Sequence, residues 1–204
     1  MNALLPAAIR QEVESLTVRF GAPVARSVAI GTAAFWQHHT SNRKSEVCMV
    51  VRRRNGHLLT ARKTFYPEGA HRLMTGGVEP GERIIDALMR EIDEETGLEV
   101  AVRRFLAVVA YHPEDAVASN DRVTRFVSFA FLVDEIAGTL GATDPNERLA
   151  AYREIMPAEL PTLADDLDQL PDVHDEDLGE NWREWGRFRA IIHHVVWDAL
   201  NADG

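Results

Sequence analysis

Apolar and polar positions along the chain follow two different periods, and the change from one to the other predicts both strands and helices. Runs rich in β-branched and aromatic residues predict strands over "SEVCMVVRR", "LEVAVRRFLAVVAYH" and "RVTRFVSFAFLVDEI". The pair Asn55-Gly56 separates the first run from "HLLTARKT", which predicts a β-hairpin closed by a type I′ turn. Strands and helices do not alternate regularly, so the pattern favours an α+β fold, or a sheet with flanking helices.

Apolar residues at helical spacing predict helices over about residues 6–16, 82–96, 158–170 and 181–202. Gly97 follows the second helix and suits the left-handed position that closes a helix. The last helix carries a set of large apolar residues near one face, which we expect to pack in the core. These residues are Trp182, Trp185, Phe188, Ile192 and Val196.

The same pattern divides the chain into three expected parts. Residues 1–45 form an N-terminal helical or irregular extension, most of which cannot be assigned an element. Residues 46–170 form the central domain. Residues 171–204 form an acidic connector and a C-terminal helix packed on that domain.

Composition narrows the class of protein. The 46% hydrophobic and 26% charged content is ordinary for a globular enzyme of 204 residues. The net charge of −10 argues against nucleic acid or an anionic membrane as the main partner. Much of the acid excess lies in residues 165–180, which we expect to be a solvated connector.

The cysteine content and the N-terminus indicate the compartment. Cys48 is the single cysteine, so no internal disulfide can form, and its apolar surroundings predict a buried strand thiol. No apolar stretch is long enough to cross a bilayer, and the N-terminus turns acidic too early for a signal peptide. We therefore expect a cytoplasmic protein.

The predicted helix over residues 82–96 crowds carboxylates onto one face. Glu91, Glu94 and Glu95 are spaced so that they share this face and border the apolar stripe. Each close pair of like charges would destabilise the helix by about 0.2–0.5 kcal/mol unless a cation relieved it. Mg²⁺ prefers oxygen ligands and is commonly held by a few carboxylates together with substrate phosphates. The glycine-rich loop "TGGVEPGE" lets backbone approach such a ligand closely.

This stretch resembles the Nudix box, G-x5-E-x7-R-E-U-x-E-E-x-G-U, in which U is a bulky apolar residue. The matching positions are Gly76, Glu82, Arg90, Glu91, Ile92, Glu94, Glu95, Gly97 and Leu98. A looser resemblance extends over about residues 46–167. One departure is visible, because Met74-Thr75-Gly76 stands where the family commonly has Pro-Gly-Gly.

The resemblance implies an α/β/α sandwich around a mixed sheet, with the box forming a loop–helix–loop. It implies divalent-metal-dependent hydrolysis of a nucleoside diphosphate linked to another moiety, so the expected partner is a small-molecule nucleotide. The expected metal is Mg²⁺, with Mn²⁺ as an alternative, and a homodimer is possible. The implied metal-binding residues are Glu91, Glu94, Glu95 and Gly76, and the implied supporting residues are Arg90, Glu82 and Gly77.

Many proteins of this family use a further carboxylate outside the box, as a metal ligand or as a base. The candidates are Glu114, Asp115, Asp144 and Glu147. We favour Glu147, because it opens "ERLAAYREIMP", whose counterpart in the family begins with such a Glu. We expect the long loop "GTLGATDPNE" to let Glu147 swing in when substrate and metal bind.

The substrate is indicated by a residue outside the box. Pro113 lies beyond the box at about the place where ADP-ribose hydrolases of the family often carry a proline. This favours ADP-ribose or a similar sugar nucleotide, with AMP and ribose 5-phosphate as products. The alternatives are an NTP or damaged-nucleotide pyrophosphohydrolase, an enzyme similar to isopentenyl diphosphate isomerase, and a Nudix sensor that binds nucleotide without hydrolysis. The intact set of box glutamates argues against the sensor.

Overall fold

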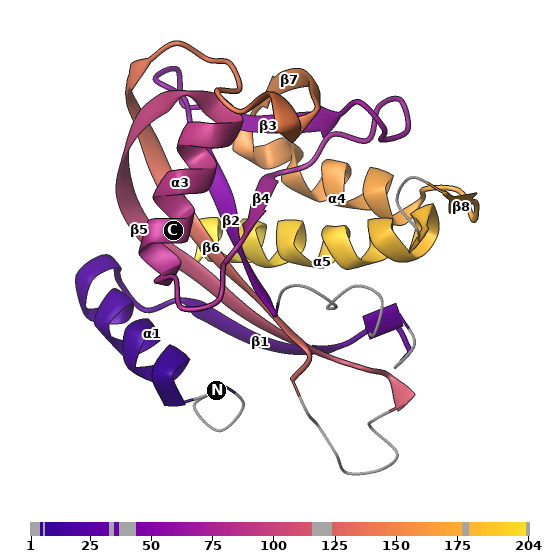
Figure 1. The fold of residues 1–204 in the computed structure, drawn as a ribbon, viewed down its shortest axis with the longest axis horizontal. Coiled ribbons are helices and arrows are strands. Elements are labelled where there is room, and N and C mark those ends of the chain that lie inside the picture. The colour runs from indigo at the N-terminus through magenta and orange to yellow at the C-terminus, as the bar shows by residue number, and fades with distance from the viewer. Residues whose placement is uncertain are drawn as a thin grey trace.

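A mixed sheet of seven strands forms the centre of the described part of the chain (Figure 1). The computed structural model describes residues 5, 7–32, 35–36, 44–115, 124–176 and 180–202. The strands are β1 (Val24–Ala29), β2 (Ser45–Arg52), β3 (Leu58–Lys63), β4 (Met74–Gly77), β5 (Leu98–His112), β6 (Phe126–Gly138) and β7 (Leu149–Ile155). Their order is β1-β5-β6-β2-β3-β7, and β4 pairs with β2 outside this path. The pairs β1–β5 and β2–β6 are parallel, and the others are antiparallel.

Helices cover both faces of this sheet (Figure 1). The helices are α1 (Ala7–Phe20), α3 (Ile84–Thr96), α4 (Leu160–Asp168) and α5 (Trp182–Asn201). Residues of α1 and α3 join one apolar cluster, and residues of α4 and α5 join another on the opposite face. Two 3-10 turns, η2 (Pro145–Glu147) and η3 (Pro157–Glu159), and a small hairpin of β8 (His174–Asp175) and β9 (Glu180–Asn181) complete the description. The predicted sandwich is confirmed.

The central strand β2 is buried on both faces, and its alternation divides the core. Val47, Met49 and Val51 join the cluster under α1 and α3. Cys48 and Val50 point the other way, into the cluster under α4 and α5. Cys48 is buried and free, as its surroundings predicted. The five large apolar residues of the last helix that we expected in the core are all buried.

The hairpin prediction was wrong in detail. Strands β2 and β3 share a single register pair, Arg52 with Leu58, and β3 pairs mainly with β7. A type I′ turn needs positive φ at both central residues. Gly56 has φ +86°, but Arg148 is the only described non-glycine residue with positive φ. The Gly56 N–H instead donates to the Arg53 carbonyl, so the glycine ends the turn.

Both ends of the chain contribute more regular structure than expected. The first helix extends to Phe20, and the unassigned stretch contains β1, which pairs with β5. At the other end, His174–Asp175 pairs with Glu180–Asn181 in a hairpin that was not expected. Asp165–Asp168 belong to α4, within the helix predicted over residues 158–170, so this part of the acidic stretch is not connector. None of the described helices combines the length and the apolar composition that crossing a bilayer requires.

Candidate metal and catalytic site

Helix α3 holds its carboxylates beside the sheet because its apolar face is anchored there. Ile84, Ala87, Leu88 and Ile92 are buried in the cluster under α1 and α3. Arg83 at the helix start provides no side-chain cap, and the Ile84 N–H donates instead to Glu12 Oε1 of α1 at 2.7 Å. Gly97, with φ +62°, ends the helix in the left-handed conformation predicted for it.

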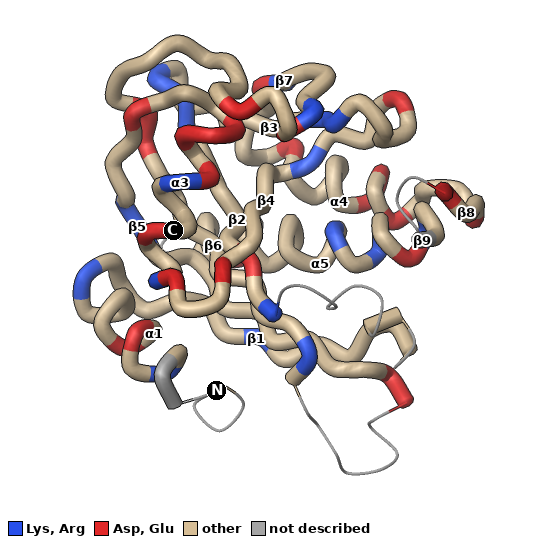
Figure 2. Tube along the Cα trace, viewed as in Figure 1, with Lys and Arg blue, Asp and Glu red and all other residues tan. Residues whose placement is uncertain are grey.

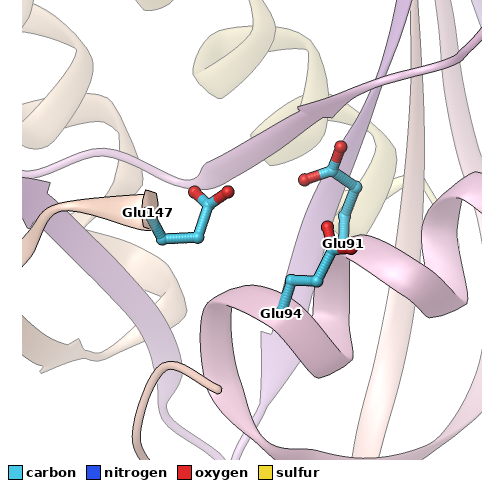
Figure 3. Close-up of side chains that lie close together, drawn as sticks. All are labelled: Glu91, Glu94 and Glu147. Carbon is cyan, nitrogen blue, oxygen red and sulfur yellow. The ribbon is translucent and has the colours of Figure 1, made fainter. Parts of the chain in front are cut away.

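Three carboxylates meet beside the second half of this helix (Figure 3). Glu91, Glu94 and Glu147 each offer an oxygen, and these oxygens all lie within 4.8 Å of one another. The first two come from α3, whereas Glu147 ends η2. Figure 3 shows the Glu147 side chain pointing across the gap toward the helix. Glu95, the third glutamate implied as a metal ligand, is outside this group of three.

Gly76 leaves the room that Glu91 occupies. A Cβ atom built on Gly76 would lie 1.9 Å from Glu91 Cδ, which is far too close for any side chain. Gly76 is fixed there by β4, where it pairs with Val47 of β2. The absence of a side chain at this position is therefore a geometric requirement, while the place of Gly76 among the metal ligands stays a prediction.

Arg90 ties the glycine-rich loop to the carboxylates. Its Nε and Nη2 donate to the two Glu82 oxygens, each at 2.9 Å, and Nη2 also donates to the Gly77 carbonyl at 2.9 Å. Its Nη1 donates to Glu91 Oε1 and Glu94 Oε2, both at 2.9 Å. These bonds hold the pKa of Glu82 below its ordinary value. One guanidinium thus orients two of the three grouped carboxylates.

Lys63 lies between the other two carboxylates of the site. Its Nζ is 2.8 Å from Glu147 Oε2 and 3.4 Å from Glu95 Oε1. Burial alone would raise the pKa of Glu147, but the hydrogen bond and charge of Lys63 outweigh burial and lower it. Burial raises the pKa of Glu95 to about 7, against the opposing charges of Arg72 and Lys63. Glu95 is 1% exposed, and the neighbouring Glu147 carboxylate adds to the rise of its pKa.

The donor set suits a hard divalent cation. Burial raises the pKa of Glu91, Arg90 opposes this, and the negative charges of Glu147 and Glu94 add to the rise. The carboxylates therefore repel one another in spite of Arg90. Figure 2 shows acidic residues along α3 and in the segment that leads into β7. Grouped carboxylate oxygens whose charge is only partly compensated are the ligands that Mg²⁺ and Mn²⁺ prefer.

The other acids proposed outside the box do not join this group. Asp144 Oδ1 accepts hydrogen bonds from the backbone and side chain of Asn146 and so caps η2. Glu114 is exposed just after the C-terminal end of β5, whereas α3 precedes the N-terminal end of that strand. Pro113, beside Glu114, is buried. Asp115 is exposed and follows directly.

The loop that carries Glu147 is attached to α3. The Gly141 N–H donates to the Thr96 carbonyl at 2.9 Å, and the Thr143 N–H donates to the Glu94 carbonyl at 3.0 Å. Thr143 Oγ1 donates to the Asp93 carbonyl at 3.0 Å. We expected this loop to swing Glu147 into the site, but the structure already places Glu147 there without such a movement.

Sequence reasoning missed Lys63 and Tyr152. Lys63 follows Leu59 and Ala61 at alternate positions of β3, and both of these face the cluster under α3. That alternation predicts the face on which Lys63 lies, although it gives no indication of the acids opposite. The Tyr152 hydroxyl of β7 donates to the Glu95 carbonyl at 2.5 Å, and only the pairing of β3 with β7 brings it there.

Comparison with known proteins identifies the family of the chain. The NUDIX domain profile matches residues 42–174. A Methanocaldococcus jannaschii protein named ADP-ribose pyrophosphatase is 34% identical over 123 residues, which cover 59% of this chain and 66% of that protein. The human 8-oxo-dGDP phosphatase NUDT18 is 28% identical over 127 residues, which cover 61% of this chain and 34% of that protein.

Among solved structures, that of a UDP-X diphosphatase is 18% identical, covers 79% of this chain and 64% of that chain, and has a TM-score of 0.48. The family profile covers more than half of the chain and includes α3 together with the loop that carries Glu147. This chain belongs to the Nudix family.

Proposed function

We propose that the protein hydrolyses a nucleoside diphosphate linked to another moiety, with a divalent cation as cofactor. The observation that carries this proposal is the group formed by Glu91, Glu94 and Glu147, whose oxygens lie within 4.8 Å of one another. When bound, Mg²⁺ or Mn²⁺ would neutralise charge on the diphosphate and help to generate the attacking hydroxide.

The residues of the site have separate proposed roles. Glu91, Glu94 and Glu147 would hold the cation. Because Glu147 is grouped with the two helix carboxylates, we favour the role of metal ligand over the role of general base for it. Arg90 and Glu82 would fix the two helix carboxylates, since Arg90 bonds all three glutamates. Glu95 and Gly76 remain proposed ligands from the box resemblance. The first lies beside Glu147 and Lys63, and the second lies against the Glu91 side chain.

ADP-ribose, or a similar sugar nucleotide, is the proposed substrate. Two observations support it: the name of the Methanocaldococcus jannaschii relative and the place of Pro113 beyond the box. Water would attack one phosphorus of the diphosphate, and the bond from that phosphorus to the bridging oxygen would break. The products would be AMP and ribose 5-phosphate, and both protons of water would be released to solvent as the two phosphate monoesters ionise.

A damaged nucleotide is the second candidate substrate. The human relative is named for action on 8-oxo-dGDP, and its aligned region covers a similar share of this chain. The same group of carboxylates would serve either substrate, because both carry a diphosphate. The choice therefore rests on residues that bind the base and the sugar, outside the metal site.

A substrate panel with Mg²⁺ tests both proposals. We expect kcat/KM to be highest for ADP-ribose, followed by UDP-sugars, with 8-oxo-dGDP and the nucleoside triphosphates lower. Chromatography identifies the products, and EDTA should abolish turnover. Faster turnover of 8-oxo-dGDP or of any triphosphate would favour the second candidate. Turnover that persists in EDTA would contradict metal-dependent hydrolysis.

A further inference from the structure

Lys63 is placed among the carboxylates by strand geometry. Alternation along β3 turns Lys63 toward α3, and the register of β3 against β7 shifts between Arg62 and Lys63. Lys63 thereby pairs with Leu149, two positions after Glu147 in the chain. The ammonium then contacts Glu147 at 2.8 Å and Glu95 at 3.4 Å. It joins an acid of the remote loop to an acid of the box helix.

Arg72 and Lys63 both compensate the charge of Glu95, but Lys63 is also in contact with Glu147. The side chains of Glu95 and Glu147 are 1% and 17% exposed, so water screens their charges poorly. The charge of Arg72 acts on Glu95, but its guanidinium donates hydrogen bonds to the Tyr66 hydroxyl, the Leu73 carbonyl and Thr75 Oγ1. Two close carboxylates are what a divalent cation would otherwise bridge. Here an ammonium lies in contact with both.

We infer that Lys63 competes with the divalent cation for the Glu95–Glu147 pair and so weakens metal binding before the nucleotide arrives. The inference rests on the proposed metal-dependent function and deepens it. A cation that takes an oxygen of Glu147 must displace the ammonium or share that carboxylate with it. Lys63 is thus a positioning residue, because it acts through Glu147 and Glu95.

Binding of Mn²⁺ alone, followed by electron paramagnetic resonance of the free ion, tests this without substrate. Lys63→Met removes the charge and keeps most of the side-chain length. We expect it to bind Mn²⁺ at least about tenfold more tightly, or to bind one additional ion, because an adjacent positive charge is lost. Lys63→Arg should bind as the wild type does.

Arg62→Met is the matched control. It removes one positive charge from the neighbouring residue of β3, whose side chain reaches the Tyr66 carbonyl at 3.5 Å instead of the carboxylates. A charge that does not contact the carboxylates interacts with them more weakly, so this control should change Mn²⁺ affinity by less than about threefold. An equal effect of Arg62→Met and Lys63→Met would show a general charge effect and overturn the inference.

A second background guards against poor folding of Lys63→Met. Glu95→Gln removes one of the two repelling charges, so Lys63→Met/Glu95→Gln should fold, as circular dichroism would verify. Within this background, loss of Lys63 should tighten Mn²⁺ binding by a smaller factor than in the wild type. Equal factors in the two backgrounds would show that Lys63 does not act on the pair, and would overturn the inference.

The outcomes separate this inference from the proposed function. Wild type that binds Mn²⁺, with unchanged or weaker binding in Lys63→Met, contradicts the competition alone. Failure of the wild type and of all variants to bind Mn²⁺ contradicts both the metal-dependent function and the competition.

Discussion

Glu147 reaches the helix carboxylates through backbone features of single residues. Asp144 caps the short turn η2, and Arg148 follows it with φ +51°, a left-handed conformation. Such a conformation costs a non-glycine residue about 1–2 kcal/mol. Arg148 recovers part of this cost, since its guanidinium lies over the Phe65 ring at 4.6 Å and its carbonyl accepts from the Thr64 N–H at 2.7 Å. The neighbours of Glu147 therefore determine its direction.

Replacing Glu147 tests its role directly. Glu147→Gln keeps the shape but removes a charge from the grouped oxygens, so we expect kcat to fall by about 10²-fold with KM within a few-fold. Mn²⁺ binding should weaken as well. Glu114→Gln, an exposed acid beyond β5, is the control and should leave both unchanged. If kcat fell in Glu114→Gln and stayed normal in Glu147→Gln, the role would belong to Glu114 in the earlier loop.

Gly76→Ala tests the space that Glu91 needs. The added Cβ would lie 1.9 Å from Glu91 Cδ, so the carboxylate must leave its place or β4 must shift. We expect Mn²⁺ binding to weaken by more than about tenfold, with a lower melting temperature, since overpacking typically costs about 1–3 kcal/mol. Gly141→Ala is the control, because a Cβ there meets nothing within 4 Å. Unchanged metal binding in Gly76→Ala would show that Glu91 can bind from another position.

At this scale the sequence predicted what depends on spacing within one helix. Glu91 and Glu94 are one turn apart, so their common face follows from helix geometry. Glu147 could be proposed only because the order of segments resembles the family. Lys63 could not be found, because its partners come from α3 and η2. The local sequence pattern predicts neither the register of β3 nor the path of the loop.

Among the elements, α3 depends on others at both of its ends. The first N–H groups and the last carbonyls of a helix lack partners within it. Glu12 of α1 accepts from the Ile84 N–H, and the loop before η2 donates to carbonyls of the last turn. The N-terminal extension and the loop of Glu147 thus complete the box helix.

Glu12→Ala should show how much the cap contributes. Loss of an N-terminal capping acceptor typically costs about 0.5–2 kcal/mol, so the free energy of unfolding should fall by about 1 kcal/mol in urea titrations. Glu12→Gln retains an acceptor oxygen and should recover most of the loss. Glu14→Ala, an exposed acid on the same helix, is the control. Equal losses for Glu12→Ala and Glu14→Ala would rule out a capping role.

Long elements were predictable, and short ones depended on their neighbours. The predicted limits of β5 coincide with the observed Leu98–His112, because its apolar run is long. The last helix was also predicted almost to its ends. Strand β1 was missed, since an edge strand with mostly exposed residues lacks an apolar run and is defined by its pairing with β5. The turn type failed because Asn55 does not adopt positive φ.

Across the whole molecule, buried polar groups link α5 to the sheet. Arg189 of α5 donates to both oxygens of Glu46 on β2, at 2.9 and 2.8 Å. His193 lies one turn further, where its Nε2 accepts from the Leu73 N–H and its Nδ1 donates to the Arg189 carbonyl. Burial lowers the pKa of His193 to about 3, and the charges of Arg72 and Arg189 add to this.

The His193 pKa predicts a pH dependence of stability. The unfolded pKa of a histidine is about 6.5, so the unfolded chain takes up a proton that the folded protein excludes. The contribution of neutral His193 to the free energy of unfolding is fully present above about pH 6.5 and is lost progressively toward pH 3. About 2 kcal/mol of it is lost by pH 5. Glu95 acts oppositely: its raised pKa stabilises the fold below about pH 4.5, and this contribution is lost as pH rises through about 7.

Because the two effects oppose each other, the measurement compares slopes between variants. The quantity compared is the free energy of unfolding at pH 5 minus that at pH 7.5, from urea titrations of metal-free protein. This difference should be about 2 kcal/mol more positive in His193→Gln than in the wild type. His194→Gln, whose ring is exposed, should keep the wild-type difference. Identical differences in all three proteins would mean that His193 is protonated in the folded state.

The loop of residues 139–144 is bonded to α3, and this limits how the loop can vary among related sequences. The bonds from Gly141 and Thr143 to the last carbonyls of α3 use backbone N–H groups, which every residue except proline carries. Apart from Thr143 and Asp144, whose side chains bond the Asp93 carbonyl and cap η2, side-chain identity is thus free to drift, whereas the number of residues is not. One insertion or deletion would move Glu147 by about 3 Å along the chain, away from Glu91 and Glu94. We expect relatives that share this site to conserve the length of the loop more strictly than its composition.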